Sequence, residues 1–122
     1  MEINSYKDLI VWQKSMDLVV AVYQLTDVFP KSEIYGIVSQ MRRAAVSIPS
    51  NIAEGTVRGT RKDYGHFIVM AYGSGAELET QIEIAKRLGL ANSKDCEKVD
   101  ALLLQVMKML NKLVASLYST KN

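Results

Sequence analysis

Apolar residues recur every three or four positions along nearly all of this 122-residue chain, and this repeat limits the fold more than any other feature. Such spacing places side chains on one face of an α-helix, whereas a strand would alternate at every second position. Residues that break helices divide the repeat into four segments, with breaks near Pro30, Gly59 and Gly89. The chain is therefore expected to be all-α.

The four expected helices span about residues 8–26, 33–57, 61–88 and 92–118. Thr60 is expected to cap the third helix at its N-terminus, and Gly89 to end it. Asn92 or Ser93 is expected to cap the fourth. The apolar stripe of the first helix is taken as Leu9, Trp12, Met16, Val19, Val20 and Tyr23. The stripe of the third is Tyr64, Phe67, Ile68, Ala71, Gly75, Leu78, Ile82 and Ala85. The stripe of the fourth is Val99, Leu102, Leu103, Val106, Leu110, Leu113 and Leu117.

The second helix contains a proline at position 49, within the stretch SIPSNIAEG. Proline inside a helix removes a hydrogen bond and clashes with the preceding turn, at a cost of about 3 kcal/mol. The apolar stripe nevertheless crosses Pro49 without a change of phase: Ile34, Ile37, Val38, Met41, Ala45, Ile48 and Ile52. One kinked helix is therefore favoured over two short helices.

The connections between the four segments are short, so consecutive helices are expected to be antiparallel neighbours. The predicted architecture is an up-down-up-down four-helix bundle with a Pro-kinked second helix, as one domain over residues 1–122. The composition, 48% hydrophobic and 23% charged, fits a globular domain. A thin bundle with wide apolar stripes suggests further burial between subunits, and hence a homo-oligomer.

A second stripe, which is polar, follows one flank of the second helix. Ser47, Asn51 and Glu54 lie at helical spacing, and Ser74 and Glu77 flank the apolar stripe of the third helix in a similar way. These five residues are called the polar seam below. Two interpretations remain open: a solvated or packing seam that fixes how helices meet, or a binding or catalytic site. Folding the two helices back on each other brings Arg42 and Arg43 level with Glu77, and a contact between Glu77 and at least one of these arginines is expected.

Basic residues concentrate in the middle of the chain, although the net charge is only +2. The basic group comprises Arg42, Arg43, Arg58, Arg61 and Lys62. Arg61 and Lys62 fall in the first turn of the third helix, where the helix dipole favours a bound anion. The group is either a solvated surface or a phosphate-contacting surface, and the few aromatic residues argue against a surface that stacks bases.

Motifs for catalysis are absent from the sequence. The one histidine, His66, lies off the apolar stripe, and the sequence has neither a Cys/His cluster of metal-binding type nor a glycine-rich phosphate loop. No enzyme activity and no cofactor are expected. The one cysteine, Cys96, is expected to be a partly buried helix residue, and no disulfide within the chain can form. A reducing cytoplasm is the simplest compartment. No apolar run of about 18 residues predicts a membrane span, and the N-terminus does not read as a signal peptide.

Several segments resemble a bacterial family of four-helix-bundle proteins. They are YKDLIVWQKSMDLVVAVYQLT near the N-terminus, SIPSNIAEG and GSGAELE. Members of that family are encoded in intervening sequences of 23S rRNA genes, and some were mislabelled as ribosomal proteins. The resemblance implies a four-helix bundle that assembles into a homopentamer. It also implies kinship with the accessory variability protein of diversity-generating retroelements, a basic pentameric barrel that binds nucleic acid and a reverse transcriptase.

Two functions follow as hypotheses. The first is a non-enzymatic oligomer that associates with RNA or other nucleic acid, with Arg58, Arg61 and Lys62 on phosphates and Arg42 and Arg43 divided between phosphates and Glu77. The alternative is a protein-interaction scaffold that docks a partner protein without touching nucleic acid.

Overall fold

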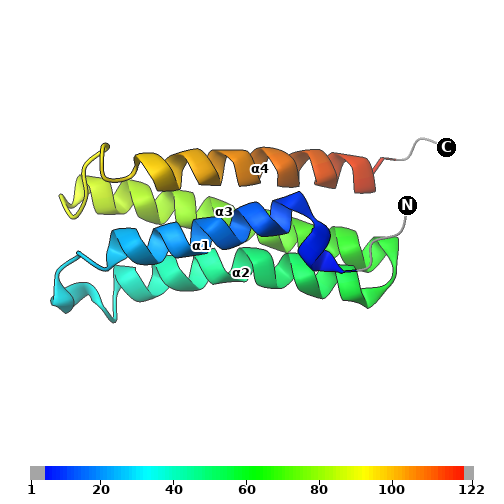
Figure 1. Ribbon diagram of the computed structural model, residues 1–122, viewed down its shortest axis with the longest axis horizontal. Coiled ribbons are helices and arrows are strands. Elements are labelled where there is room, and N and C mark those ends of the chain that lie inside the picture. Colours follow the sequence, from blue (N-terminus) through cyan, green and yellow to red (C-terminus); the bar gives the residue numbers. More distant parts are fainter. Residues whose placement is uncertain (1–4, 120–122) are drawn as a thin grey trace.

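The computed structural model describes residues 5–119 and contains four α-helices and no strand in that range (Figure 1). The helices are α1 (Ile10–Thr26), α2 (Ile37–Arg58), α3 (Arg61–Arg87) and α4 (Glu97–Leu117). Two short 3-10 helices precede α1 and α2, η1 (Tyr6–Asp8) and η2 (Lys31–Glu33). The all-α prediction and the number of helices are confirmed.

The helices form a long bundle in which each helix packs against the next one in the chain, and α4 packs against α1. Figure 1 shows α1 running from right to left, α2 back to the right, α3 to the left and α4 to the right. Bonds between chain-distant ends agree with these directions. Lys86 at the end of α3 reaches Asp100 at the start of α4, and Arg61 at the start of α3 reaches Ser116 at the end of α4.

Helix α2 passes through Pro49 without interruption. Val38, Met41, Ala45, Ile48 and Ile52 are all buried, so the core-facing stripe keeps its phase on both sides of the proline. Only a continuous helix keeps residues so far apart on one face. The prediction of one helix rather than two is confirmed.

The core is built from the stripes expected in α2, α3 and α4, but α1 presents a different face. Met16, Val20 and Tyr23, assigned to the core from their spacing, are 40%, 54% and 43% exposed. The buried residues of α1 are Val11, Ser15, Leu18, Ala21, Val22, Leu25 and Thr26. Because α1 is apolar on most sides, its sequence contains two stripes of helical spacing, and periodicity selected the wrong one.

Helix boundaries follow the capping residues. The side chain of Thr60 accepts a hydrogen bond from the Asp63 amide at 3.1 Å, as a cap should. Gly59 and Gly89 take positive φ angles of 90° and 75°, which end α2 and α3. The prediction that Asn92 or Ser93 caps the fourth helix is wrong. The Asn92 side chain accepts from the Asp95 amide at 2.8 Å within the preceding turn, and α4 begins only at Glu97, after Cys96, which makes no side-chain cap.

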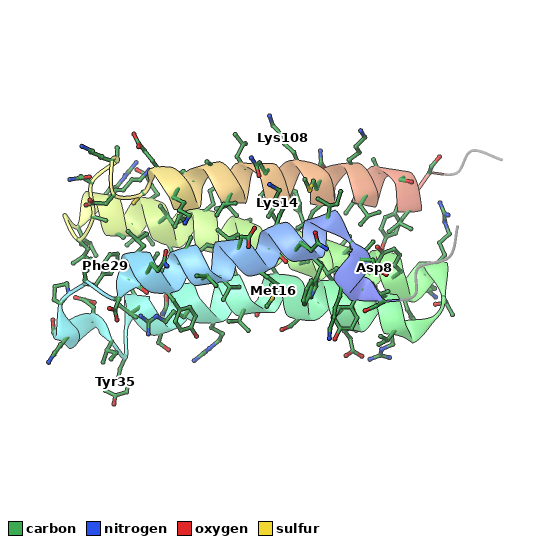
Figure 2. The ribbon with its side chains drawn as sticks, viewed as in Figure 1. Asp8, Lys14, Met16, Phe29, Tyr35 and Lys108 are labelled. Atoms are coloured by element: carbon green, nitrogen blue, oxygen red, sulfur yellow. The ribbon has the colours of Figure 1, made fainter. Side chains whose placement is uncertain are left out.

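The start of the second helix was predicted too early. Residues 31–33 form η2, a turn follows, and α2 begins only at Ile37. Ile34, counted in the apolar stripe, is therefore 48% exposed, and the neighbouring Tyr35 is 95% exposed. Figure 2 shows Tyr35 projecting away from the bundle at the connection between α1 and α2.

Helices α2 and α3 approach most closely near their shared turn. A Cβ added to Gly55 would lie 2.8 Å from Cβ of Phe67 and 3.3 Å from the carbonyl oxygen of Tyr64. Glycine at this position lets the two backbones come together. The same pair of helices separates towards the other end of the bundle, where an open groove lies between them.

Candidate interaction surfaces

The groove between α2 and α3 has a volume of about 700 Å³. It is lined by Gln40, Arg43, Ala44, Ser47, Gly73, Ala76, Glu77, Thr80, Gln81 and Ile84. Arg43 and Glu77 are the only charged side chains in this lining, and the rest are small, amide, hydroxyl or apolar. The groove therefore has the chemistry of a packing surface more than of an ion-binding site.

One atom in the groove lacks a hydrogen-bond partner. Oε1 of Gln81 is buried and accepts no hydrogen bond, and it is the one side-chain nitrogen or oxygen in this state among residues 5–119. A buried polar atom without a partner costs about 1–3 kcal/mol. Gly73, near the same groove, has nothing within 4 Å of an added Cβ. At Gly73, this side of α3 is thus open to close approach by another backbone.

Three members of the polar seam satisfy groups within their own helix. Oγ of Ser47 donates to the carbonyl of Arg43 at 2.9 Å, and Nδ2 of Asn51 donates to the carbonyl of Ser47 at 2.8 Å. Glu54 pairs with Arg58 one turn later at 2.8 Å. On α3, no hydrogen bond or ion pair joins Ser74 or Glu77 to α2 in the described part of the chain. The seam is therefore a set of local helix bonds beside the groove, not a hydrogen-bonded lock between α2 and α3.

Arg42 is directed at α1 instead of α3. Its Nε donates to Oγ1 of the buried Thr26 at 2.9 Å, and its guanidinium lies over the ring of Tyr23, 4.4 Å from the centroid. Both contacts hold the end of α1 against the start of α2. The expected link from Arg42 to Glu77 is absent because Arg42 lies on the other flank of α2.

Arg43 and Glu77 line the same groove, yet no ion pair within 4.0 Å joins them; the ion pairs in residues 5–119 are Glu54–Arg58, Glu83–Arg87 and Lys86–Asp100. The predicted contact of an arginine with Glu77 is thus not made as a charge-assisted bond. The two opposite charges instead face a common opening.

The other members of the basic group lie at the turn between α2 and α3, and two of them have partners. Arg58 pairs with Glu54 and lies over Phe67, 5.0 Å from the ring centroid. Arg61 donates to the carbonyls of Ser116 and Leu117 at 2.8 and 3.3 Å, so it closes the C-terminal end of α4. Lys62 is exposed and has no ion pair in the described range. The basic group thus spreads over three flanks of the bundle: Arg42 faces α1, Arg43 the groove, and Arg61 α4.

Replacing Arg61 with glutamine is expected to lower the free energy of unfolding by about 0.3–1 kcal/mol, because a cation at a helix C-terminus stabilises the helix dipole and caps its last carbonyls. Urea unfolding followed by circular dichroism measures the change. The matched control is Lys62→Gln, which removes the neighbouring charge without removing such a contact. Equal losses for the two variants would show that Arg61 does not support α4.

The described residues show no constellation suited to catalysis. No group of three or more His, Cys, Asp and Glu side chains that could hold a metal occurs among residues 5–119. Cys96 is fully buried, and its burial raises the pKa of the thiol, which keeps it protonated and unreactive. Burial also raises the pKa of the Tyr64 phenol. His66 is exposed and packs edge-on against Phe67. In this part of the chain, no helix has the length and hydropathy to cross a bilayer.

The geometry therefore defines a small all-α bundle with a packing groove and scattered cations, in which no catalytic cluster occurs among the described residues. A comparison with known protein families identifies the family of the chain. Residues 7–112 match the family described as 23S rRNA-intervening sequence protein, and the chain belongs to that family.

A solved structure supports the fold. The chain is similar to the crystal structure of a protein of unknown function from the S23 ribosomal protein family of Bacteroides thetaiotaomicron. The TM-score is 0.77 at 20% identity, and the match covers 86% of this chain and 98% of the other. No curated protein matches. Neither the family nor the solved structure indicates an enzyme.

The sequence analysis singled out Arg43, Ser47 and Glu77, which line the groove, but it did not predict that α2 and α3 leave a groove between them. A signal was present. Val69, Tyr72, Gly73, Ala76, Thr80 and Ile84 recur at helical spacing on the outer face of α3, and none of them is charged. From Val69 to Thr80 this arc of α3 has no charged residue, and charges return to it only with Glu83 and Arg87 in the last turns.

Proposed function

We propose that this chain is a non-enzymatic helical protein that self-associates, with the α2–α3 face packed against further copies. The observation that carries the proposal is the wide groove between α2 and α3, whose lining is mostly uncharged and has one charge of each sign. A second copy covers the groove, and the opposite charges of Arg43 and Glu77 pair across the contact.

Exposed apolar residues on α3 support this surface. Ile84, in the groove lining, is 43% exposed, and Val69, one turn before Gly73 on the same side of α3, is 44% exposed. Burial of such side chains is worth about 25 cal/mol per Å² of apolar surface. In a homo-oligomer, for which the family resemblance suggests five copies, the α2–α3 groove of every chain is covered by a neighbouring copy.

Replacing Ala76 with arginine is expected to convert the assembly to monomers. Ala76 is an exposed groove residue, so a long cation there obstructs a neighbouring chain without disturbing the core. Sedimentation velocity measures the change. The matched control is Ala101→Arg, the same substitution at an exposed position on α4. A monomeric wild-type chain, or equal dissociation of both variants, would refute the α2–α3 contact.

Association with nucleic acid is the second candidate function. It is favoured by the free cations Arg43 and Lys62 and by the exposed flank of Arg58. In this candidate, Arg58, Arg61 and Lys62 contact phosphates near the turn, and an oligomer multiplies the few charges of each chain. Arg42 and Arg61 contribute less than the other members of the basic group, because their guanidinium groups already have partners in the bundle.

A further inference from the structure

A set of lysines outside the basic group lies on the side of the bundle formed by α1 and α4. Lys98, Lys108 and Lys112 are exposed on α4, and Lys14 is half-buried on α1. At about 100° per residue, the three α4 lysines fall within about 80° of one another on the helix surface. They extend over about 21 Å of helix axis, at 1.5 Å per residue.

The antiparallel packing of α1 and α4 brings Lys14 into this set. Gln24 of α1 and Lys98 of α4 line one small hollow near the loop end of the bundle. Lys14 comes ten residues before Gln24, and Lys108 comes ten residues after Lys98. The two lysines are therefore level with each other. Figure 2 shows Lys14 and Lys108 at the same place along the long axis of the bundle.

These four lysines have no ion-pair partner among residues 5–119. From Ala101 to Leu117, α4 contains no acidic residue. The acids that border this side are Asp17 on α1 and Asp95 and Glu97 at the start of α4. The last two lie beside Lys98 and offset it. Asp17, one turn after Lys14, offsets Lys14 in the same way, so the unbalanced positive charge is centred on Lys108 and Lys112. These two residues and the neighbouring Lys14 are called the lysine face.

We infer that the lysine face binds the phosphodiester backbone of a nucleic-acid strand. Ammonium groups act on phosphate as point charges, so a row of them attracts a polyanion without reading its sequence. Between Glu97 and Leu117, α4 has no aromatic residue on which a base could stack. The contact is thus electrostatic and independent of base sequence.

An acidic protein partner fits this surface less well. Protein interfaces depend on apolar or aromatic anchors at their centre. The residues between the lysines on this flank of α4 are Ala101 and Gln105, and the exposed Leu104 lies on the flank that faces α3. The α4 part of the lysine face therefore offers charge without an aromatic or apolar anchor, and the exposed apolar residue beside Lys14 is Ile10, at 63%. The inference rests on the second candidate function but places the contact on a different side of the bundle from Arg58, Arg61 and Lys62.

The test is binding of fluorescein-labelled 20-nucleotide single strands of RNA and of DNA, measured by anisotropy between 50 and 500 mM salt. Lys108→Gln with Lys112→Gln is expected to make the slope of log K against log salt shallower by about 1.4, at about 0.7 for each phosphate that the variant no longer neutralises. It should also weaken binding at least tenfold at the lowest salt. RNA and DNA should respond alike, because the contact is to the backbone.

The matched control is Lys31→Gln with Lys94→Gln, which removes two exposed charges at the loop end, and its salt slope should stay close to that of the wild type. If the wild type binds neither strand, both the inference and the second candidate function are wrong. If the wild type binds but the lysine-face variant has the same affinity and salt slope as the control, the inference alone is wrong. The same conclusion follows if binding is weakened only by the triple variant in which Arg58, Arg61 and Lys62 are replaced with glutamine. Displacement by poly-L-glutamate is expected of any electrostatic contact. Binding of poly-L-glutamate more tightly than either strand at equal charge concentration would assign the face to an acidic polypeptide and overturn the inference as well.

Discussion

Replacing Ile52 with alanine is expected to lower the free energy of unfolding by about 2–5 kcal/mol. Ile52 is fully buried on α2, one turn after Pro49. Its side chain reaches the core only because the helix keeps its phase across the proline. The loss therefore combines the transfer free energy of the removed carbons with the cavity they leave.

Urea unfolding at one protein concentration measures this effect, since self-association would make stability depend on concentration. Val57→Ala is the matched control, because Val57 lies on the same helix at 65% exposure. Its effect should stay within about 0.5 kcal/mol. A helix that ended at Pro49 would leave Ile52 outside the core, and the two variants would then differ little.

Two glycine-to-alanine substitutions are expected to act in opposite directions. Alanine is the better helix former by about 1 kcal/mol. Gly73→Ala should therefore stabilise the chain by about 0.5–1 kcal/mol, because nothing lies within 4 Å of the new Cβ. At Gly55 the new Cβ would lie 2.8 Å from Cβ of Phe67, so α2 and α3 must separate. Overpacking of this kind costs about 1–3 kcal/mol and outweighs the helix preference.

Both substitutions should be measured in the Ala76→Arg background, so that contacts between copies do not contribute. Thermal and urea unfolding then report the bundle alone. Gly73→Ala also serves as the control for Gly55→Ala, because both exchanges occur inside a helix. Stabilisation by both alanines would mean that the close approach of α2 and α3 at Gly55 does not limit the packing.

Much of the fold follows from local rules. Three kinds of feature could be predicted from the sequence because each depends on neighbours within a few residues. They are the helix breaks at Pro30, Gly59 and Gly89, the N-terminal cap at Thr60, and the apolar stripes of α2, α3 and α4. The early start predicted for the second helix has a local cause as well. Ile34 has the right spacing, but the chain around Gly36 adopts a turn before α2 begins.

The candidate surfaces were less predictable, because the partners of a side chain on the flank of a helix depend on which helix packs beside it. Arg42 and Arg43 are adjacent in sequence, yet one meets Thr26 on α1 and the other faces the groove. Arg61 looked like an anion contact at the start of α3 and instead closes the end of α4. Thr26 and Ser116, the partners of Arg42 and Arg61, lie on other helices and are distant in sequence.

The sequence by itself determined that this chain forms four helices and that α2 continues through Pro49, because hydrophobic spacing and capping act over a few residues. The tertiary structure alone decided which stripe of α1 is buried, which arginines have partners in the bundle, and which residues line the groove between α2 and α3. The physical reason is that burial and hydrogen-bond satisfaction depend on what packs opposite a side chain. The stretch around Pro49 is thus a continuous core helix whose outer flank, beside the groove, is the proposed contact with further copies.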